Sequence, residues 1–139
     1  NSRLFDALPQ RQYRLAQNRS ANDIMTIDWD VALGIVDGRQ DLLLELIDIF
    51  FAENAEIMPR ISAAIDNGDA GELQLFAHRL KGCLGYFGQS KAGEIAWQLE
   101  SLGRVRTLDD APQLLAQLQI AVDELLPPLR AYRQEHQQP

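Results

Sequence analysis

Apolar residues recur at helical spacing in four successive segments of this chain, and no segment shows the strict alternation that is typical of a β-strand. The four segments are residues 39–66, 70–87, 91–104 and 110–126. Short turns, such as those at Asn67-Gly68 and Gly88, separate them, and a short turn places consecutive helices side by side in opposite directions. The sequence therefore predicts an all-α fold, an antiparallel up-down-up-down four-helix bundle with an additional N-terminal helix.

Residues that favour helix N-termini mark where these helices begin. The capping positions are Asp28, Asp69, Ser90 and Asp110. The first of them precedes a short helix predicted over residues 29–36. Pro59 is expected to kink its helix without ending it, because the apolar pattern continues beyond it in register. Pro127-Pro128 is expected to bend or break the last helix before a final stretch to about residue 135.

Charge divides the chain into a short basic start and a longer acidic part. Residues 1–22 hold four arginines against one aspartate, a net charge of +3, which leaves −10 on the rest of a chain whose formal net charge is −7. We expect residues 1–26 to form a linker or a peripheral helix, with a short helix over 10–18, ahead of a bundle over residues 27–135. Residues 136–139 are expected to form a frayed tail. The acidic bundle argues against a nucleic-acid partner, because phosphate neutralisation supplies most of that affinity.

Several kinds of site find no support in the sequence. The longest apolar run, Leu42-Leu43-Leu44, is far too short to span a bilayer, so we expect no direct membrane contact. The single cysteine, Cys83, falls on the core-facing side of its helix and cannot form an internal disulfide, which fits a reducing, cytoplasmic compartment. The two histidines, His78 and His136, are far apart in sequence, so no metal site is predicted.

The helix that contains His78 has one side stripped of bulky side chains. With each residue turning the helix by about 100°, Gly82 and Gly85 lie within about 40° of His78. Gln74 lies within the same range, and Lys81 lies about 60° away, one turn on. Each glycine costs a helix interior roughly 1 kcal/mol relative to alanine. Because two occur on this side, we expect them to keep His78 open to approach by another protein.

An exposed imidazole can carry a phosphoryl group under three conditions. Partner proteins must reach the ring, one ring nitrogen must be held by an acceptor so that the other is the nucleophile, and nearby positive charge must offset the incoming anion. The glycines meet the first condition and Lys81 meets the third. The turn at residues 88–90 reverses the chain, so Glu100 is expected to return beside His78 and to hold the second ring nitrogen.

Residues of this helix and the next resemble the motif of a histidine-containing phosphotransfer (HPt) domain. The motif reads His78-x-Leu80-Lys81-Gly82-x-x-Gly85, then Gly88 in the turn and Leu99-Glu100 further on. The chain is similar in particular to the type of HPt domain at the C-terminus of hybrid sensor histidine kinases, and the opening at residues 27–30 agrees with that type. The resemblance covers residues 27–126 and leaves residues 1–26 outside it.

The resemblance implies a role for each residue of this motif. His78 accepts and donates the phosphoryl group at Nε2, and Glu100 forms a hydrogen bond with the other ring nitrogen. Lys81 stabilises the charge of the phosphoryl group, and Gly82 clears the docking surface. The other residues assigned to the docking face for a receiver domain are Gly85, Arg79 and Gln74.

The resemblance also implies a carrier rather than an enzyme. Such a domain has no ATP site and no cofactor of its own, and it passes the phosphoryl group reversibly between aspartates of response regulator receiver domains, which supply the Mg²⁺. We expect a monomer. The parent chain is expected to be a hybrid sensor histidine kinase, with this domain in the cytoplasmic part of an inner-membrane protein.

Two alternatives to a phosphocarrier are open at this point. The chain could be a helical docking or scaffold module whose histidine is unused, or the histidine-bearing domain of a chemotaxis-type kinase. Taken singly, Glu100 could be an ordinary exposed acid and Lys81 a solvated lysine. Trp29 and Trp97 are predicted to be core or partly buried packing residues, and His136 is predicted to be exposed to solvent.

Overall fold

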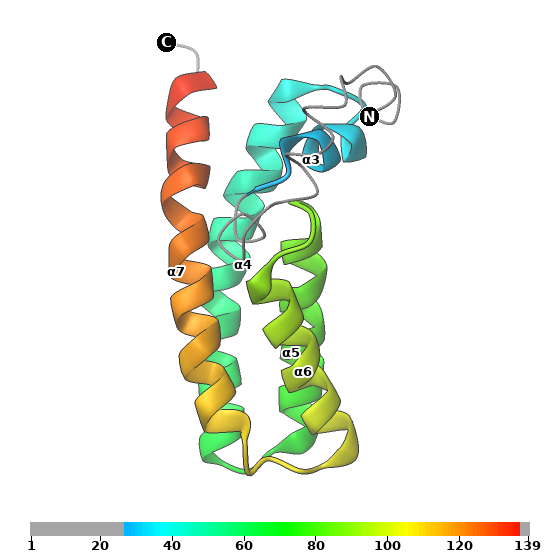
Figure 1. The fold of residues 1–139 in the computed structure, drawn as a ribbon, viewed down its shortest axis with the longest axis vertical. Helices are drawn as coiled ribbons and strands as arrows, with labels where there is room; N and C mark the ends of the chain where they lie inside the picture. The colour runs from blue at the N-terminus through cyan, green and yellow to red at the C-terminus, as the bar shows by residue number, and fades with distance from the viewer. Residues whose placement is uncertain (1–26, 137–139) are drawn as a thin grey trace, which may run out of the picture.

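The computed structural model describes residues 27–136, and within this part the chain forms five helices. The helices are α3 (Trp29–Ile35), α4 (Gln40–Asp66), α5 (Ala70–Gly85), α6 (Lys91–Val105) and α7 (Ala111–His136). Helices α4 and α6 each pack on both α5 and α7, so the four long helices close into a ring. The α4–α5 and α6–α7 turns lie at one end of the bundle, and the α5–α6 turn lies toward the other (Figure 1). The predicted four-helix bundle is confirmed, with α3 as the additional helix.

The long helices of the bundle come in two lengths. Helices α4 and α7 have 27 and 26 residues, whereas α5 and α6 have 16 and 15. The longer pair therefore extends beyond the shorter pair at one end, where α3 packs against α4 (Figure 1). His78 lies near the middle of α5, at a level where all four helices are present. Within residues 27–136, no helix is both long and apolar enough to cross a membrane.

Three of the predicted N-caps accept a hydrogen bond from the backbone of the helix that they start. Asp28 accepts from the N–H three residues on at 3.2 Å, Asp69 does so at 3.1 Å and Ser90 at 3.0 Å. The backbone N–H of Asp28 also donates to Phe87 O at 2.9 Å and ties α3 to the α5–α6 turn. Gly88 in that turn has a φ of +92°, and a Cβ there would lie 2.6 Å from Asp28 Cβ. Only glycine fits this position, which fixes where α6 starts relative to α5.

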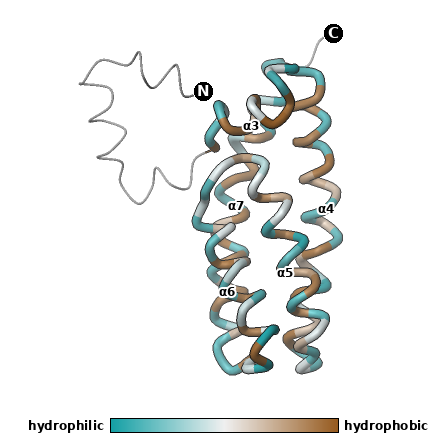
Figure 2. Tube along the Cα trace, turned by 90° about the vertical axis from the view of Figure 1, so that its right-hand side faces the viewer, coloured by the Kyte–Doolittle hydropathy of each residue, from teal (hydrophilic) through white to brown (hydrophobic). Residues whose placement is uncertain are grey.

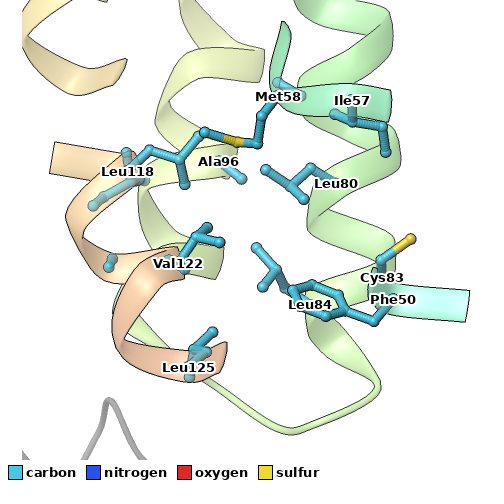
Figure 3. Close-up of a cluster of buried hydrophobic side chains, with 14 of the residues drawn as sticks. Phe50, Ile57, Met58, Leu80, Cys83, Leu84, Ala96, Leu118, Val122 and Leu125 are labelled. Carbon is cyan, nitrogen blue, oxygen red and sulfur yellow. The ribbon is translucent and has the colours of Figure 1, made fainter. Parts of the chain in front are cut away.

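The core consists of the apolar sides of the four long helices. Figure 2 shows hydrophobic and hydrophilic residues alternating along each helix, as expected for amphipathic helices. In Figure 3, Leu80 and Leu84 of α5 point toward Leu118 and Val122 of α7. Cys83 is buried, as predicted. Each fully buried leucine contributes roughly 1.5–3 kcal/mol, so this packing holds α5 in place beneath its exposed outer side.

Of the two predicted effects of Pro127-Pro128, a bend or a break, the break is wrong. Helix α7 continues through both prolines to its end at residue 136. Each proline in a helix interior costs roughly 3 kcal/mol. Leu125 and Leu129, on either side of the pair, are fully buried, and their packing on the core keeps the helix continuous. Helix α4 likewise continues past Pro59, as the sequence predicts.

An aromatic stack joins α3 to the end of α7. The Trp29 ring lies 4.0 Å from the Tyr132 ring, which confirms its predicted packing role. The centre of the His136 ring lies 4.0 Å from the centre of the Tyr132 ring, and His136 Nδ1 lies 2.9 Å from Tyr132 O. His136 therefore belongs to α7 rather than to a frayed tail, and it is half-buried rather than exposed as predicted. The helix predicted over residues 10–18 and the end of the predicted tail lie outside the described residues.

Candidate functional site

His78 lies on the outer side of α5 and is open to solvent. Its side chain is 64% exposed, and Gly82 and Gly85 beside it are exposed as well. A Cβ added at either glycine would meet no atom within 4 Å. Both glycines therefore leave empty space over α5, and the open side that the sequence predicts around His78 is present.

Glu100 reaches His78 from α6. Its Oε2 lies 2.9 Å from His78 Nδ1, as expected from the reversal of the chain at residues 88–90. Glu100 is only 4% exposed, so the alternative of an ordinary exposed acid is wrong. In the neutral ring, an Nδ1–H that donates to this carboxylate leaves the lone pair on Nε2. Nε2 is thus the nucleophilic atom of the exposed imidazole.

The close approach of α5 and α6 depends on Gly103, which the sequence analysis does not single out. A Cβ at this position would lie 2.7 Å from Gln74 N and 2.8 Å from Ala70 O, and both are backbone atoms of α5. Gly103 lies about one turn beyond Glu100, so this contact also sets the spacing between Glu100 and His78. In the sequence, a glycine this close to the end of a helix resembles an ordinary stop signal.

Two cationic side chains also lie next to the Glu100 carboxylate. Lys81 Nζ lies 2.8 Å from Oε1, and Arg104 Nη2 lies 3.2 Å from Oε2. The same carboxylate therefore holds Lys81 one turn along α5 from His78. Arg104 is a site residue that the sequence analysis missed, although a spacing of four residues from Glu100 on one helix is a known signal for an ion pair.

These contacts decide the protonation of Glu100. Burial raises the pKa of the carboxyl group, but Lys81 and His78 lower it by more, so the pKa of Glu100 lies below its ordinary value. Glu100 is therefore ionised at neutral pH. An ionised carboxylate is the stronger acceptor for the His78 Nδ1 proton and the stronger partner for Lys81.

We expect the bundle to lose stability in acid partly through Glu100. Its pKa is lowered in the folded protein from an ordinary value of 4.5, so folding favours the ionised carboxylate. This stabilisation is complete above that value and is lost as the pH falls through the depressed pKa of the folded state. Unfolding by denaturant, measured from about pH 7 to about pH 3, should show a steeper fall in the free energy of unfolding for the parent protein than for Glu100→Gln. Parallel curves would contradict this role for Glu100.

Arg79 is engaged with α4. Its Nη2 lies 3.0 and 3.1 Å from the two carboxylate oxygens of Glu53 and 3.9 Å from Glu56. The hydrogen bond with Glu53 raises the pKa of Arg79. The guanidinium also lies 5.3 Å from the centre of the Phe76 ring. In the structure the charge of Arg79, which the family resemblance assigns to the edge of the docking face, also joins α4 to α5.

A hollow of about 400 Å³ opens beside the site, between the end of α5 and the start of α6. Its walls include Lys81, Gly85, Gly93 and Trp97. Trp97 is 54% exposed, so the prediction of a core or partly buried packing residue is wrong at this position. Ala96 lies on the buried side of α6, and the next residue, Trp97, faces outward.

The arrangement is suited to receive an electrophilic anion at one nitrogen atom. The His78 side chain is exposed, its Nδ1 is held by Glu100, and Lys81 supplies positive charge one turn away. Within residues 27–136, no group of three or more His, Cys, Asp or Glu side chains is placed to hold a metal ion.

Comparisons with known proteins identify a family and a similar structure. The model of the Hpt domain family matches residues 45–127, a range that includes His78, Lys81 and Glu100. The crystal structure of histidine-containing phosphotransfer protein B (HptB) from Pseudomonas aeruginosa PAO1 matches with a TM-score of 0.74 at 25% sequence identity. The match covers 80% of this chain and 96% of that chain. No curated protein sequence matches this chain.

Proposed function

This chain belongs to the Hpt domain family, and from that membership we propose that His78 is the residue that carries its phosphoryl group. The chain functions in histidine phosphotransfer within phosphorelay signalling, and Hpt domains are phosphocarriers rather than catalysts. One observation carries the assignment of His78: its ring is exposed while its Nδ1 is held 2.9 Å from a buried carboxylate.

The proposed transfer is a displacement at phosphorus. The lone pair of His78 Nε2 attacks the phosphorus of an aspartyl phosphate on a partner protein, and the bond from phosphorus to the aspartate oxygen breaks. The aspartate leaves with that electron pair as a carboxylate. The proton on Nδ1 stays in its hydrogen bond to Glu100, whose negative charge offsets the positive charge that the ring acquires. By the same reaction in reverse, His78 passes the phosphoryl group to the aspartate of a second receiver domain.

Lys81 stabilises the phosphoryl group in this proposal. Its ammonium group is 2.8 Å from Glu100 Oε1 and about one helical turn from His78. A short rotation of its flexible side chain exchanges Glu100 for a phosphoryl oxygen. Glu100 keeps a cationic neighbour in that state, because Arg104 lies 3.2 Å from its Oε2.

The partners of an Hpt domain in a phosphorelay are receiver domains. The proposed docking face surrounds His78 on α5. Gly82 and Gly85 admit the partner backbone, and Gln74 and Arg79 complete the face. The Mg²⁺ required for aspartyl phosphate chemistry belongs to the receiver, and this chain supplies no cofactor. We also propose that the chain is a monomer and that its parent chain is a hybrid sensor histidine kinase. A cytoplasmic location is proposed as well, and the single, buried cysteine of the chain supports it.

A transfer assay separates this function from the alternatives. Receiver domains are phosphorylated with a labelled small-molecule donor and Mg²⁺, purified, and mixed with the 139-residue chain. A phosphocarrier takes up label that is stable in base and lost in acid, as expected for phosphohistidine. A scaffold binds a receiver without taking up label. The histidine-bearing domain of a chemotaxis-type kinase takes up label from a kinase domain with ATP and not from a receiver.

Replacing Lys81 by alanine is expected to slow phosphoryl uptake by roughly tenfold, because one positive charge near the transferred group is lost. Rapid-quench measurement of label transfer at saturating receiver gives the rate. Arg130→Ala is the control, since Arg130 is an exposed cation on α7. Its rate should equal that of the parent, and a Lys81→Ala rate equal to the parent would remove the role assigned to Lys81.

A further inference from the structure

Trp97 is a large apolar side chain that this fold does not use for packing. It is 54% exposed, whereas Trp29 is stacked against Tyr132. Exposing so large an aromatic surface to water is unfavourable, and tryptophan is the residue most enriched at the energetic centres of protein interfaces. An exposed tryptophan on α6 is therefore a candidate contact residue for a partner protein.

The register of α5 and α6 places Trp97 beside the phosphotransfer site. The two helices are antiparallel, and the pair His78–Glu100 fixes their alignment. Lys81 lies three residues after His78, and Trp97 lies three residues before Glu100. Both are displaced about 4.5 Å in the same direction along the bundle, and both line the same hollow of about 400 Å³.

Small residues shape the surface on this side of Trp97. The hollow is bounded by Gly85, Gly88, Ser90 and Gly93, and a Cβ at Gly85 would meet no atom within 4 Å. A second hollow, of about 460 Å³, lies between α6 and α7, and Trp97 lines it as well. The indole therefore stands between two depressions, so a protein surface can contact both of its sides.

We propose that Trp97 is the anchor residue of the docking surface for the receiver domain. The inference rests on the proposed function, because it takes the phosphoryl donor at His78 to be a receiver. A specific interface buries about 800 Å² on each partner, which corresponds to a patch that reaches roughly 15 Å from its centre. A receiver that brings its aspartate to His78 thus covers Trp97 as well.

Trp97 contributes affinity and not chemistry. Among the described residues, the hydrogen bonds and ion pairs of His78 and Glu100 do not include Trp97, and the positive charges at the site come from Lys81 and Arg104. Loss of the indole therefore weakens the encounter complex and leaves the transfer step within the complex unchanged. This separation distinguishes a docking role from a role in the geometry of the site.

The test is the dependence of single-turnover transfer rate on receiver concentration, with a receiver that labels the parent protein. Trp97→Ala should raise the receiver concentration for half-maximal rate by about tenfold or more, while the maximal rate stays within about twofold of the parent. Trp97→Phe should give an intermediate value. The control is Ile120→Ala, which removes a side chain that is 62% exposed on α7, diagonal to α5 in the ring. It should change neither quantity.

The possible results distinguish failure of the docking role of Trp97 from failure of the proposed phosphotransfer function. An unchanged half-maximal concentration in Trp97→Ala overturns the docking role, as does a lower maximal rate at an unchanged half-maximal concentration. If Trp97→Ala does not fold, as judged by circular dichroism, Trp97→Phe alone decides by the same comparison. A parent protein that no receiver labels contradicts the proposed function itself. Tryptophan emission of the parent that shifts with its own concentration, and not in Trp97→Phe, would assign this surface to a second copy of the chain instead.

Discussion

Replacing His78 by glutamine is expected to abolish phosphoryl uptake from a receiver domain, by at least about a thousandfold. Glutamine has a side chain of similar reach, and its amide can still form a hydrogen bond with Glu100. It has no nucleophilic ring nitrogen, so no phosphoramidate forms. Because the His78 side chain is 64% exposed, the core does not change, and the variant should melt close to the parent temperature.

The measurement is base-stable label on the protein after mixing with phosphorylated receiver. His136→Gln is the matched control, since His136 is the other histidine of the chain and lies on α7. It should take up as much label as the parent. Equal labelling of His78→Gln and the parent would show that the phosphoryl group is carried elsewhere.

Replacing Gly103 by alanine is expected to destabilise the bundle by about 1–3 kcal/mol. The new Cβ would lie 2.7 Å from Gln74 N and 2.8 Å from Ala70 O, and neither backbone atom can move without shifting α5. A loss of 1 kcal/mol lowers the melting temperature of a domain near this size by about 3–5 °C. The shift also moves Glu100 away from His78, so phosphoryl transfer should slow as well.

Gly82→Ala is the matched control for this substitution, and we expect an effect of opposite sign. Gly82 lies inside α5, and its added Cβ would meet no atom within 4 Å. Alanine is favoured over glycine in a helix interior by roughly 1 kcal/mol, so this variant should be as stable as the parent or more stable. Thermal and denaturant unfolding of both variants gives the comparison. If Gly103→Ala were as stable as Gly82→Ala, the close contact of α5 and α6 at Gly103 would be wrong.

The sequence alone determined which segments are helical and that His78 lies on a side of α5 without bulky side chains. Asp28, Asp69 and Ser90 cap helices because short polar side chains pair locally with free backbone N–H groups, and this chemistry depends on near neighbours only. The position of Glu100 beside His78 was also predictable. A short turn between two helices leaves little freedom in their register.

Only the tertiary structure decided how closely the helices approach and which partner each long side chain takes. Helix α7 continues through Pro127-Pro128 because burial of the leucines around them outweighs a local preference. Arg79 pairs with Glu53 on α4, a partner that the helical periodicity of α5 does not identify. Gly103 matters through backbone atoms of α5 that are about 30 residues away in the chain. Helical periodicity tells which side of a helix is apolar, but distances across a bundle follow from how all four helices pack at once.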